Sequence, residues 1–148
     1  MSTEIERYDE AVASLTAAGQ PFAFETIELG GIHYRNYTQM PANLGAYCQM
    51  MQGHGDKTCM VYREQRYSFA EAWAHSVAFG AALIDRYDLA KGERVAILSR
   101  NNPQWMMAFI GATAVGAVAV PMNAWWTTEE LDYGFADCGA KIVVADRE

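Results

Sequence analysis

The alternation of apolar and polar segments is sharpest in residues 94–123, where it predicts a strand, a helix and a second strand. Residues 95–98 form a short apolar run, which is typical of a strand covered on both faces. Asn102 suits the cap of the following helix, and Pro103 suits its first position, whose N–H has no intrahelical partner. Residues 117–120 are the second strand. A unit of this length favours parallel strands joined by a right-handed crossover.

The same pattern continues on both sides of this unit. Gly116 suits the end of the helix, and Pro121 is expected to close the second strand. A helix over residues 128–137 and a third apolar strand over residues 142–145 are expected to follow, and a long helix over residues 69–87 to precede the unit. The fold class expected for the second half is therefore α/β, with a parallel βαβαβ core.

The first half of the chain is expected to hold shorter elements. Gly30 and Gly31 favour a hairpin turn, because glycine adopts positive φ at little steric cost. The expected elements are a helix over residues 1–19, a hairpin over 22–37, a short helix over 41–52, a polar loop over 53–56, and strands over 58–62 and 66–69. Three helices are expected to begin with a capping box: Thr3 with Glu6, Ser68 with Glu71, and Thr127 with Glu130.

Apolar residues at helical spacing mark the face that each helix is expected to bury. The first helix is expected to pack on the body of the protein through Ala11, Leu15 and Ala18. The expected stripes in the other helices are Trp73, Val77, Gly80, Ile84 and Tyr87; Trp105, Phe109, Ala112 and Val115; and Leu131, Phe135 and Cys138. Gly80 would let the long helix approach its neighbour closely.

Composition limits the possible partners. The chain has 148 residues, of which 51% are hydrophobic, enough for one domain with a core. A net charge of −7 and 11 scattered basic residues argue against nucleic-acid binding, which needs clustered cations. The uncharged run of 18 residues at 105–122 is at the lower limit for a membrane span. Its glycines and proline favour a buried α/β core instead, with no transmembrane segment.

The number and spacing of the cysteines indicate the cellular compartment of the protein. Cys48, Cys59 and Cys138 are odd in number and lack metal-ligand spacing, which favours buried thiols in a reducing, cytoplasmic environment. The acidic first twenty residues do not resemble a signal peptide. A reactive thiol would need a nearby base, and the three histidines have no suggestive spacing to any cysteine: His33, His54 and His75.

The sequence contains no motif that supplies chemistry by itself. The phosphate loops GxxxxGK[ST] and GxGxxG are absent. No Ser/His/Asp order suggests a triad, and Glu129 and Glu130 lie in a first helical turn, where the helix dipole explains them. One candidate remains, residues 99–104, at the carboxyl end of a parallel strand, where open α/β sheets bind ligands. Asn101 and Asn102 either bind a ligand there or only form the turn and cap the helix.

Three segments together resemble the first part of the adenylate-forming superfamily: YSFAEAW (67–73), KGERVAILSRNNPQWMMAFIGATAVGAVAVPMN (91–123) and TTEELDYGFADCGAKIVVAD (127–146). This superfamily includes acyl-CoA synthetases, adenylation domains of peptide synthetases and beetle luciferase. The resemblance covers residues 58–147 and rests on the order and spacing of five landmarks. The hairpin and the PANL segment (41–44) are similar to the leader of medium- or long-chain fatty acyl-CoA ligases. Departures from the family pattern are mild: Ser68-Phe69 for Thr-Tyr, Glu93 for Asp and Gln104 for Glu.

The resemblance implies two-step ligase chemistry. ATP with Mg²⁺ activates a carboxylic acid, expected to be a fatty acid, to an acyl-adenylate, and the acyl group then passes to the thiol of coenzyme A. In this family the phosphate loop, the nucleotide motifs and the catalytic lysine lie further along the chain. No catalytic, cofactor-binding or metal-binding residue is therefore assigned here, and the fragment is expected to be inactive with none of these ligands bound.

The resemblance also implies a domain organisation. A leader over residues 1–56 is expected to precede the first α/β subdomain of the AMP-binding domain over residues 57–148, which is truncated before the phosphate loop. This is an incomplete part of the large domain of adenylate-forming enzymes. A βαβαβ unit that ends after its third strand leaves edges and faces uncovered, so a homo-oligomer through exposed apolar surface is expected.

Two other functions stay open at this point. One is a small free-standing nucleotide-binding domain, for which the sequence offers no phosphate-binding turn. The other is a non-catalytic α/β interaction module that meets a partner through Trp125 and Trp126, since exposed aromatic side chains can anchor an interface.

Overall fold

The computed structural model describes residues 3–147. The chain divides into two compact units, one ending at Pro41 and one beginning at Ala42. The domain boundary expected between residues 56 and 57 stays a prediction.

The first unit consists of a helix and a hairpin. Helix α1 (Glu4–Thr16) begins with the predicted capping box of Thr3 and Glu6. Strands β1 (Phe24–Leu29) and β2 (Ile32–Tyr37) pair antiparallel around Gly30 and Gly31, whose φ values of 59° and 79° confirm the predicted turn.

Helix α1 ends earlier than the sequence predicts. The helix ends at Thr16 and not at Gly19, because Ala17 is extended and its carbonyl accepts from the N–H of Gln20 in a turn. Among the described residues of α1 none is buried, so the expected packing of this helix on the body of the protein stays a prediction.

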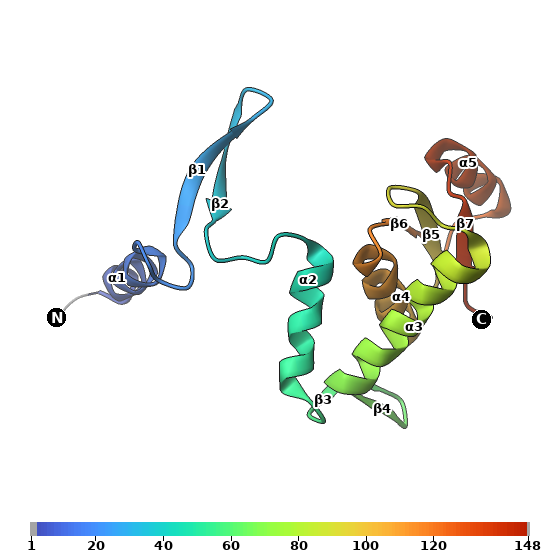
Figure 1. Ribbon diagram of the computed structural model, residues 1–148, viewed down its shortest axis with the longest axis horizontal. Helices are drawn as coiled ribbons and strands as arrows, with labels where there is room; N and C mark the ends of the chain where they lie inside the picture. Colours follow the sequence, from blue (N-terminus) through green and yellow to red (C-terminus); the bar gives the residue numbers. More distant parts are fainter. Residues whose placement is uncertain (1–2, 148) are drawn as a thin grey trace. The chain divides into compact units, whose positions relative to one another are not determined.

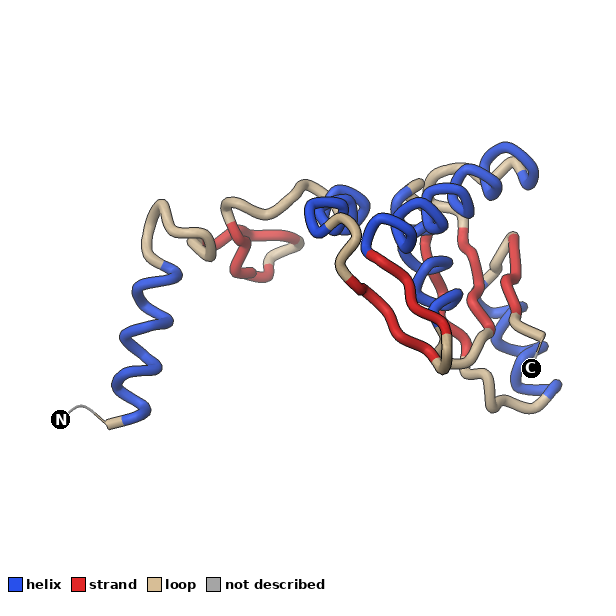
Figure 2. The backbone as a smooth tube through the Cα atoms, turned by 90° about the horizontal axis from the view of Figure 1, so that it is seen from below, coloured by secondary structure: helices blue, strands red, loops and turns tan. Residues whose placement is uncertain are grey.

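The second unit holds the predicted parallel βαβαβ core, which the structure confirms. Its elements are α2 (Leu44–Gln49), the 3₁₀-helix η1 (Met50–His54), β3 (Thr58–Tyr62), β4 (Gln65–Ser68), α3 (Phe69–Tyr87), β5 (Arg94–Leu98), α4 (Pro103–Ala114), β6 (Val118–Met122), α5 (Thr128–Cys138) and β7 (Ile142–Ala145) (Figure 1). Strands β3 and β4 form a hairpin, and the other three form a parallel sheet in the order β6-β5-β7. Helices α3 and α4 cover one side of this sheet and α5 lies on the other (Figure 2), as two right-handed crossovers in opposite directions require.

Three predicted boundaries in this unit were wrong. Helix α2 begins at Leu44, because Asn43 caps it by accepting from the N–H of Ala46 at 2.8 Å. The 3₁₀-helix then extends into the predicted polar loop at 53–56. Strand β4 begins earlier than predicted, at Gln65, because Arg63 adopts a left-handed φ of 52° and completes the reversal within two residues.

Pro121 does not close β6, as the sequence predicted, but lies inside it, paired with Ile97. Strand β6 is at an edge of the sheet within the described chain. Proline is tolerated in edge strands because its missing N–H has no ladder partner to lose there.

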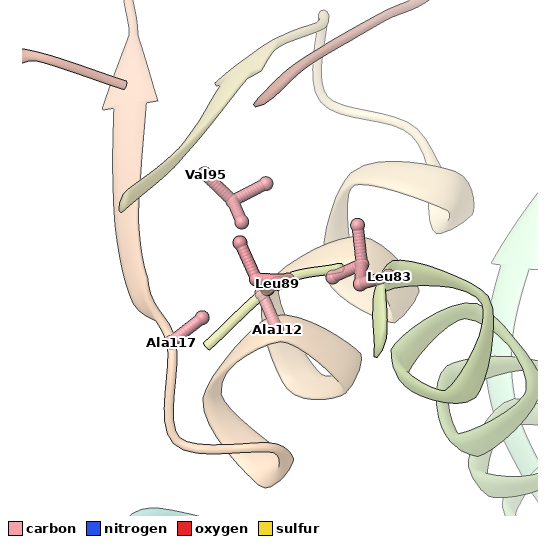
Figure 3. Packing of buried hydrophobic residues seen from close by; sticks show 5 residues of the cluster. All are labelled: Leu83, Leu89, Val95, Ala112 and Ala117. Carbon is pink, nitrogen blue, oxygen red and sulfur yellow. The ribbon is translucent and has the colours of Figure 1, made fainter. Parts of the chain in front are cut away.

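The core lies between the sheet and the α3–α4 layer. Val95, Ala96 and Ile97 of β5 have no exposed surface, as the continuous apolar run predicted. Figure 3 shows Val95 with Leu83 of α3 and Leu89 packing against Ala112 of α4 and Ala117. The two outer strands are less covered: Val118 of β6 is 47% exposed and Val143 of β7 is 46% exposed.

The buried face of α3 differs from the predicted stripe. Only Gly80 of that stripe is buried, and it is joined by small residues and one leucine: Ala72, Ser76 and Leu83. The cause is the close approach of α4: a Cβ on Gly111 would lie 2.3 Å from the carbonyl oxygen of Ser76, and one on Gly80 would lie 2.8 Å from that of Gly111. Large side chains do not fit this contact, so Val77 and Ile84 face outward and are 44% and 47% exposed.

In helices α4 and α5 the residues predicted to face inward are buried or half-buried. Ala112 of α4 is buried, whereas Trp105, Phe109 and Val115 are half-buried. The predicted inward residues of α5 are all half-buried: Leu131, Phe135 and Cys138. Over residues 3–147, none of the helices combines the length and the apolar character that crossing a membrane requires.

Candidate functional site

The candidate site lies where the three parallel strands end. We call this the carboxyl edge: the turn of residues 99–104 after β5, together with Asp146 after β7. Strand β5 is central, and the chain leaves it toward β6 through α4, whereas β7 lies on its other side. The ends of β5 and β7 therefore flank the topological switch point, where open α/β sheets bind ligands.

Asn102 performs the capping role that the sequence predicted. Its side-chain Oδ1 accepts from the backbone N–H of Trp105 at 2.9 Å, and Pro103 occupies the first helical position. Its amide Nδ2 donates to Ser99 Oγ at 3.0 Å. The predicted alternative, in which Asn102 only shapes the turn, accounts for both contacts. Asn101 is exposed.

Asp146 is the residue that sequence reasoning missed. Its Oδ2 accepts hydrogen bonds from Ser99 Oγ at 2.9 Å, from the backbone N–H of Arg100 at 2.9 Å and from Asn102 Nδ2 at 3.2 Å. Its own N–H donates to the carbonyl of Leu98 at 3.3 Å. The one available signal was an acidic residue directly after a predicted buried strand at the same edge as the candidate turn.

Several hollows open at the carboxyl edge, and Trp105 borders three of them. These three have volumes of about 320 Å³ toward Met60 of β3, about 190 Å³ toward Val144 of β7 and about 400 Å³ toward Trp125. The Trp105 ring stacks on that of Phe109, with centroids 5.6 Å apart and planes 4° apart. Trp105 is therefore a lining residue shared by three hollows that lie beside a polar turn.

The two tryptophans of the loop after β6 have different environments. Trp125 is 78% exposed, and the guanidinium of Arg100 lies 5.0 Å from its ring centroid. Trp126 is 39% exposed, and a Cβ on Gly134 of α5 would lie 2.9 Å from its ring. Trp125 is therefore the more exposed of the two aromatic side chains.

The remaining sequence candidates are not brought together. His54 lies against Phe69 and His75 against Tyr67, while His33 is opposite Glu28 in the first unit. Cys48, Cys59 and Cys138 are half-buried and unpaired with one another. Burial raises the pKa of the Cys48 and Cys59 thiols, which disfavours the reactive thiolate.

Two further observations concern charged groups. Within residues 3–147, no three His, Cys, Asp or Glu side chains lie close enough together to hold a metal ion. Glu130 completes the predicted capping box with Thr127, which confirms the structural interpretation of that acidic pair. At the carboxyl edge, the groups that the structure shows are the hydrogen-bonded side chains of Ser99, Asn102 and Asp146 and the apolar lining around Trp105.

Comparison with known proteins agrees with this architecture. A family model described as AMP-binding enzyme matches residues 49–148. The chain is 31% identical over 106 residues to 4-coumarate-CoA ligase 1 of Narcissus pseudonarcissus, covering 70% of this chain and 19% of that protein. It is 38% identical over 64 residues to the long-chain-fatty-acid–CoA ligase FadD13 of Mycobacterium tuberculosis, covering 43% and 13%.

A solved structure gives the same result for the fold. The anthranilate CoA ligase AuaEII, in complex with anthranoyl-AMP, is similar with a TM-score of 0.68 at 22% identity, covering 73% of this chain and 21% of that one. The chain thus spans less than a quarter of the length of each of these proteins. With two thirds of its residues matched by the family model, the chain belongs to the AMP-binding enzymes.

Proposed function

We propose that this protein is an ATP-dependent acid–thiol ligase. The carboxylate of the acid attacks the α-phosphate of ATP and releases pyrophosphate, and the thiol of coenzyme A then displaces AMP to form the thioester. The observation that carries this proposal is the family match over residues 49–148, which coincides with a parallel βαβαβ core in the topology β6-β5-β7.

The described segment supplies framework in this reaction. Its best-placed polar groups, at the carboxyl edge, bond one another through Ser99, Asn102 and Asp146. We assign none of ATP, Mg²⁺ and coenzyme A to residues of this segment, and residues 1–148 alone are inactive in this proposal. The fold then builds one wall of an active site that the whole enzyme completes.

The acid is a fatty acid in this proposal. The similarity to a long-chain-fatty-acid ligase supports this, together with the leader hairpin β1–β2. The similarity to a 4-coumarate ligase makes an aromatic acid the competing substrate.

Two properties of the whole protein go with the proposal. The half-buried free thiols support a reducing, cytoplasmic location. A homo-oligomer is supported by a groove of about 510 Å³ that residues of α2, α3 and α4 line, and its apolar lining includes Trp73, Val77, Ile84 and Val115. A second copy would cover this groove, and a sedimentation measurement that finds only monomer would contradict the oligomer.

The exposed Trp125 favours the second candidate function, an interaction module. A partner that binds wild type but not Trp125→Ala, in a protein without ligase activity, would favour this alternative. The free-standing nucleotide-binding domain would require tight ATP binding by residues 1–148.

Trapping of the acyl-adenylate tests the ligase proposal. The protein encoded by the whole reading frame and residues 1–148 are each incubated with ATP, Mg²⁺ and hydroxylamine, with palmitate, octanoate or 4-coumarate as the acid. We expect palmitoyl hydroxamate from the former and no product from the latter. Turnover by residues 1–148 would contradict the framework role, preference for 4-coumarate would contradict the fatty acid, and a reading frame that ends at Glu148 would contradict the ligase.

A further inference from the structure

The turn after β5 presents three hydrogen-bond donors to a single point. Ser99 Oγ, the Arg100 N–H and Asn102 Nδ2 lie 2.9, 2.9 and 3.2 Å from the same oxygen, Oδ2 of Asp146. Convergent neutral donors of this kind are a common way in which proteins hold an anion. The anion held here belongs to the chain itself.

This contact lies at the switch point of the sheet, where a ligand would be expected. The donor at the start of α4 is engaged as well, because the N–H of Trp105 donates to Asn102 Oδ1. Asn102 therefore joins two interactions: its oxygen caps the helix and its amide nitrogen holds the carboxylate. The turn and the Trp105 N–H at the helix start are thus engaged by side chains of this chain.

The carboxylate is also held in place by the sheet. Asp146 directly follows β7, which pairs with β5 from Val95 to Leu98, and its N–H extends this pairing to the carbonyl of Leu98. A tethered group competes with a free ligand at a high effective concentration. An incoming phosphate would have to displace this carboxylate and would meet its negative charge.

We propose that Asp146 is an internal anion that closes the switch-point turn of residues 99–102 to phosphate and fixes it as framework. The phosphates of a nucleotide are then bound elsewhere in the protein. This inference concerns the turn alone, and it stands or falls independently of the ligase activity.

Phosphate titration followed by ¹H–¹⁵N NMR tests the proposal, with inorganic phosphate and pyrophosphate as the probes. In wild type we expect no saturable shift of the Arg100 and Trp105 amides. In Asp146→Ala the donors are released, and we expect saturable shifts at these amides, with phosphate binding at least about tenfold tighter than to wild type. Asp132→Ala is the matched control, because it removes the same charge from an exposed position on α5.

A second variant keeps the test decisive if Asp146→Ala does not fold. Asp146→Asn retains an acceptor oxygen but loses the charge, so we expect phosphate binding that is stronger than in wild type and weaker than in Asp146→Ala. Saturable phosphate shifts of the Arg100 amide in wild type would overturn the proposal. So would the absence of such shifts in both folded Asp146 variants, or equally tight binding by Asp132→Ala.

Discussion

The α3–α4 contact and the carboxyl edge of the sheet differ in how closely their residues pack. At the contact, two glycines bring backbones so close that a Cβ on Gly111 would lie 2.3 Å from a carbonyl oxygen. At the carboxyl edge the packing is looser, and three hollows of about 190 to 400 Å³ border Trp105. One region leaves no room for a single methyl group, and the other leaves hollows between its side chains.

We expect the α3–α4 contact to contribute more to the stability of the segment than the carboxyl edge. Tight packing of α3 on α4 and of both on β5 fixes the sheet, whereas the carboxyl edge is held by a few hydrogen bonds around Asp146. Substitutions at the contact should therefore unfold the segment, and substitutions at the edge should loosen it locally.

The largest effect is expected at the contact. Gly111→Ala forces a Cβ against the backbone of Ser76, which cannot move without separating the helices, so the free energy of unfolding should fall by about 3 kcal/mol or more. Urea denaturation followed by circular dichroism measures this. Gly53→Ala is the control, since a Cβ there meets nothing within 4 Å, and its effect should stay below about 1 kcal/mol. Equal effects of the two variants would show that the close α3–α4 contact is not what stabilises the segment.

A smaller effect is expected at the edge. Asn102→Ala removes the cap of α4 and one donor to Asp146, which should lower the free energy of unfolding by about 2 kcal/mol. Hydrogen exchange should accelerate most at the Trp105 amide. The neighbouring exposed Asn101→Ala should leave both quantities unchanged, and acceleration spread evenly over α3 and β5 would show that the edge is part of the same packed unit.

Particular residues show how far the sequence predicts this fold. The three capping boxes, the hairpin glycines and β7 follow from neighbours within a few positions, and all are observed. The buried face of α3 does not follow, because it depends on how closely α4 approaches and not on apolar spacing. For the site, the cap at Asn102 was predictable, but its bond to Asp146 joins residues 44 positions apart. Pairing of β7 with β5 creates that contact, and no local pattern encodes it.

The smallest effect on stability is expected from the ion pair of Lys141 and Glu93, which precede strands β7 and β5, and this effect should depend on pH. Lys141 donates to Glu93 at 2.8 Å and to the carbonyl of Asp88, and the Lys141 hydrogen bond, followed by that from the Ala90 N–H, lowers the pKa of Glu93. A carboxyl with a lowered pKa in the folded state stabilises above its ordinary pKa, and this stabilisation is lost as the pH falls below that value through the lowered pKa.

Lys141→Met should therefore lose part of the acid sensitivity of wild type. Between about pH 6 and about pH 3, the decrease in Tm should be smaller for this variant than for wild type. Lys57→Met, which removes a charge from an exposed position outside the sheet, should retain the wild-type decrease. A parallel pH dependence in Lys141→Met and wild type would show that this ion pair contributes nothing measurable, as many exposed pairs do.

We infer that this segment is framework and has no nucleotide site of its own. Calorimetric titration of residues 1–148 with ATP and Mg²⁺ is the decisive measurement, with circular dichroism confirming that the protein is folded. We expect no saturable heat of binding, because the donors at the switch-point turn are engaged by Asp146 and Asn102. Saturable binding of ATP at micromolar concentration, with amide shifts at Arg100 and Trp105, would contradict it.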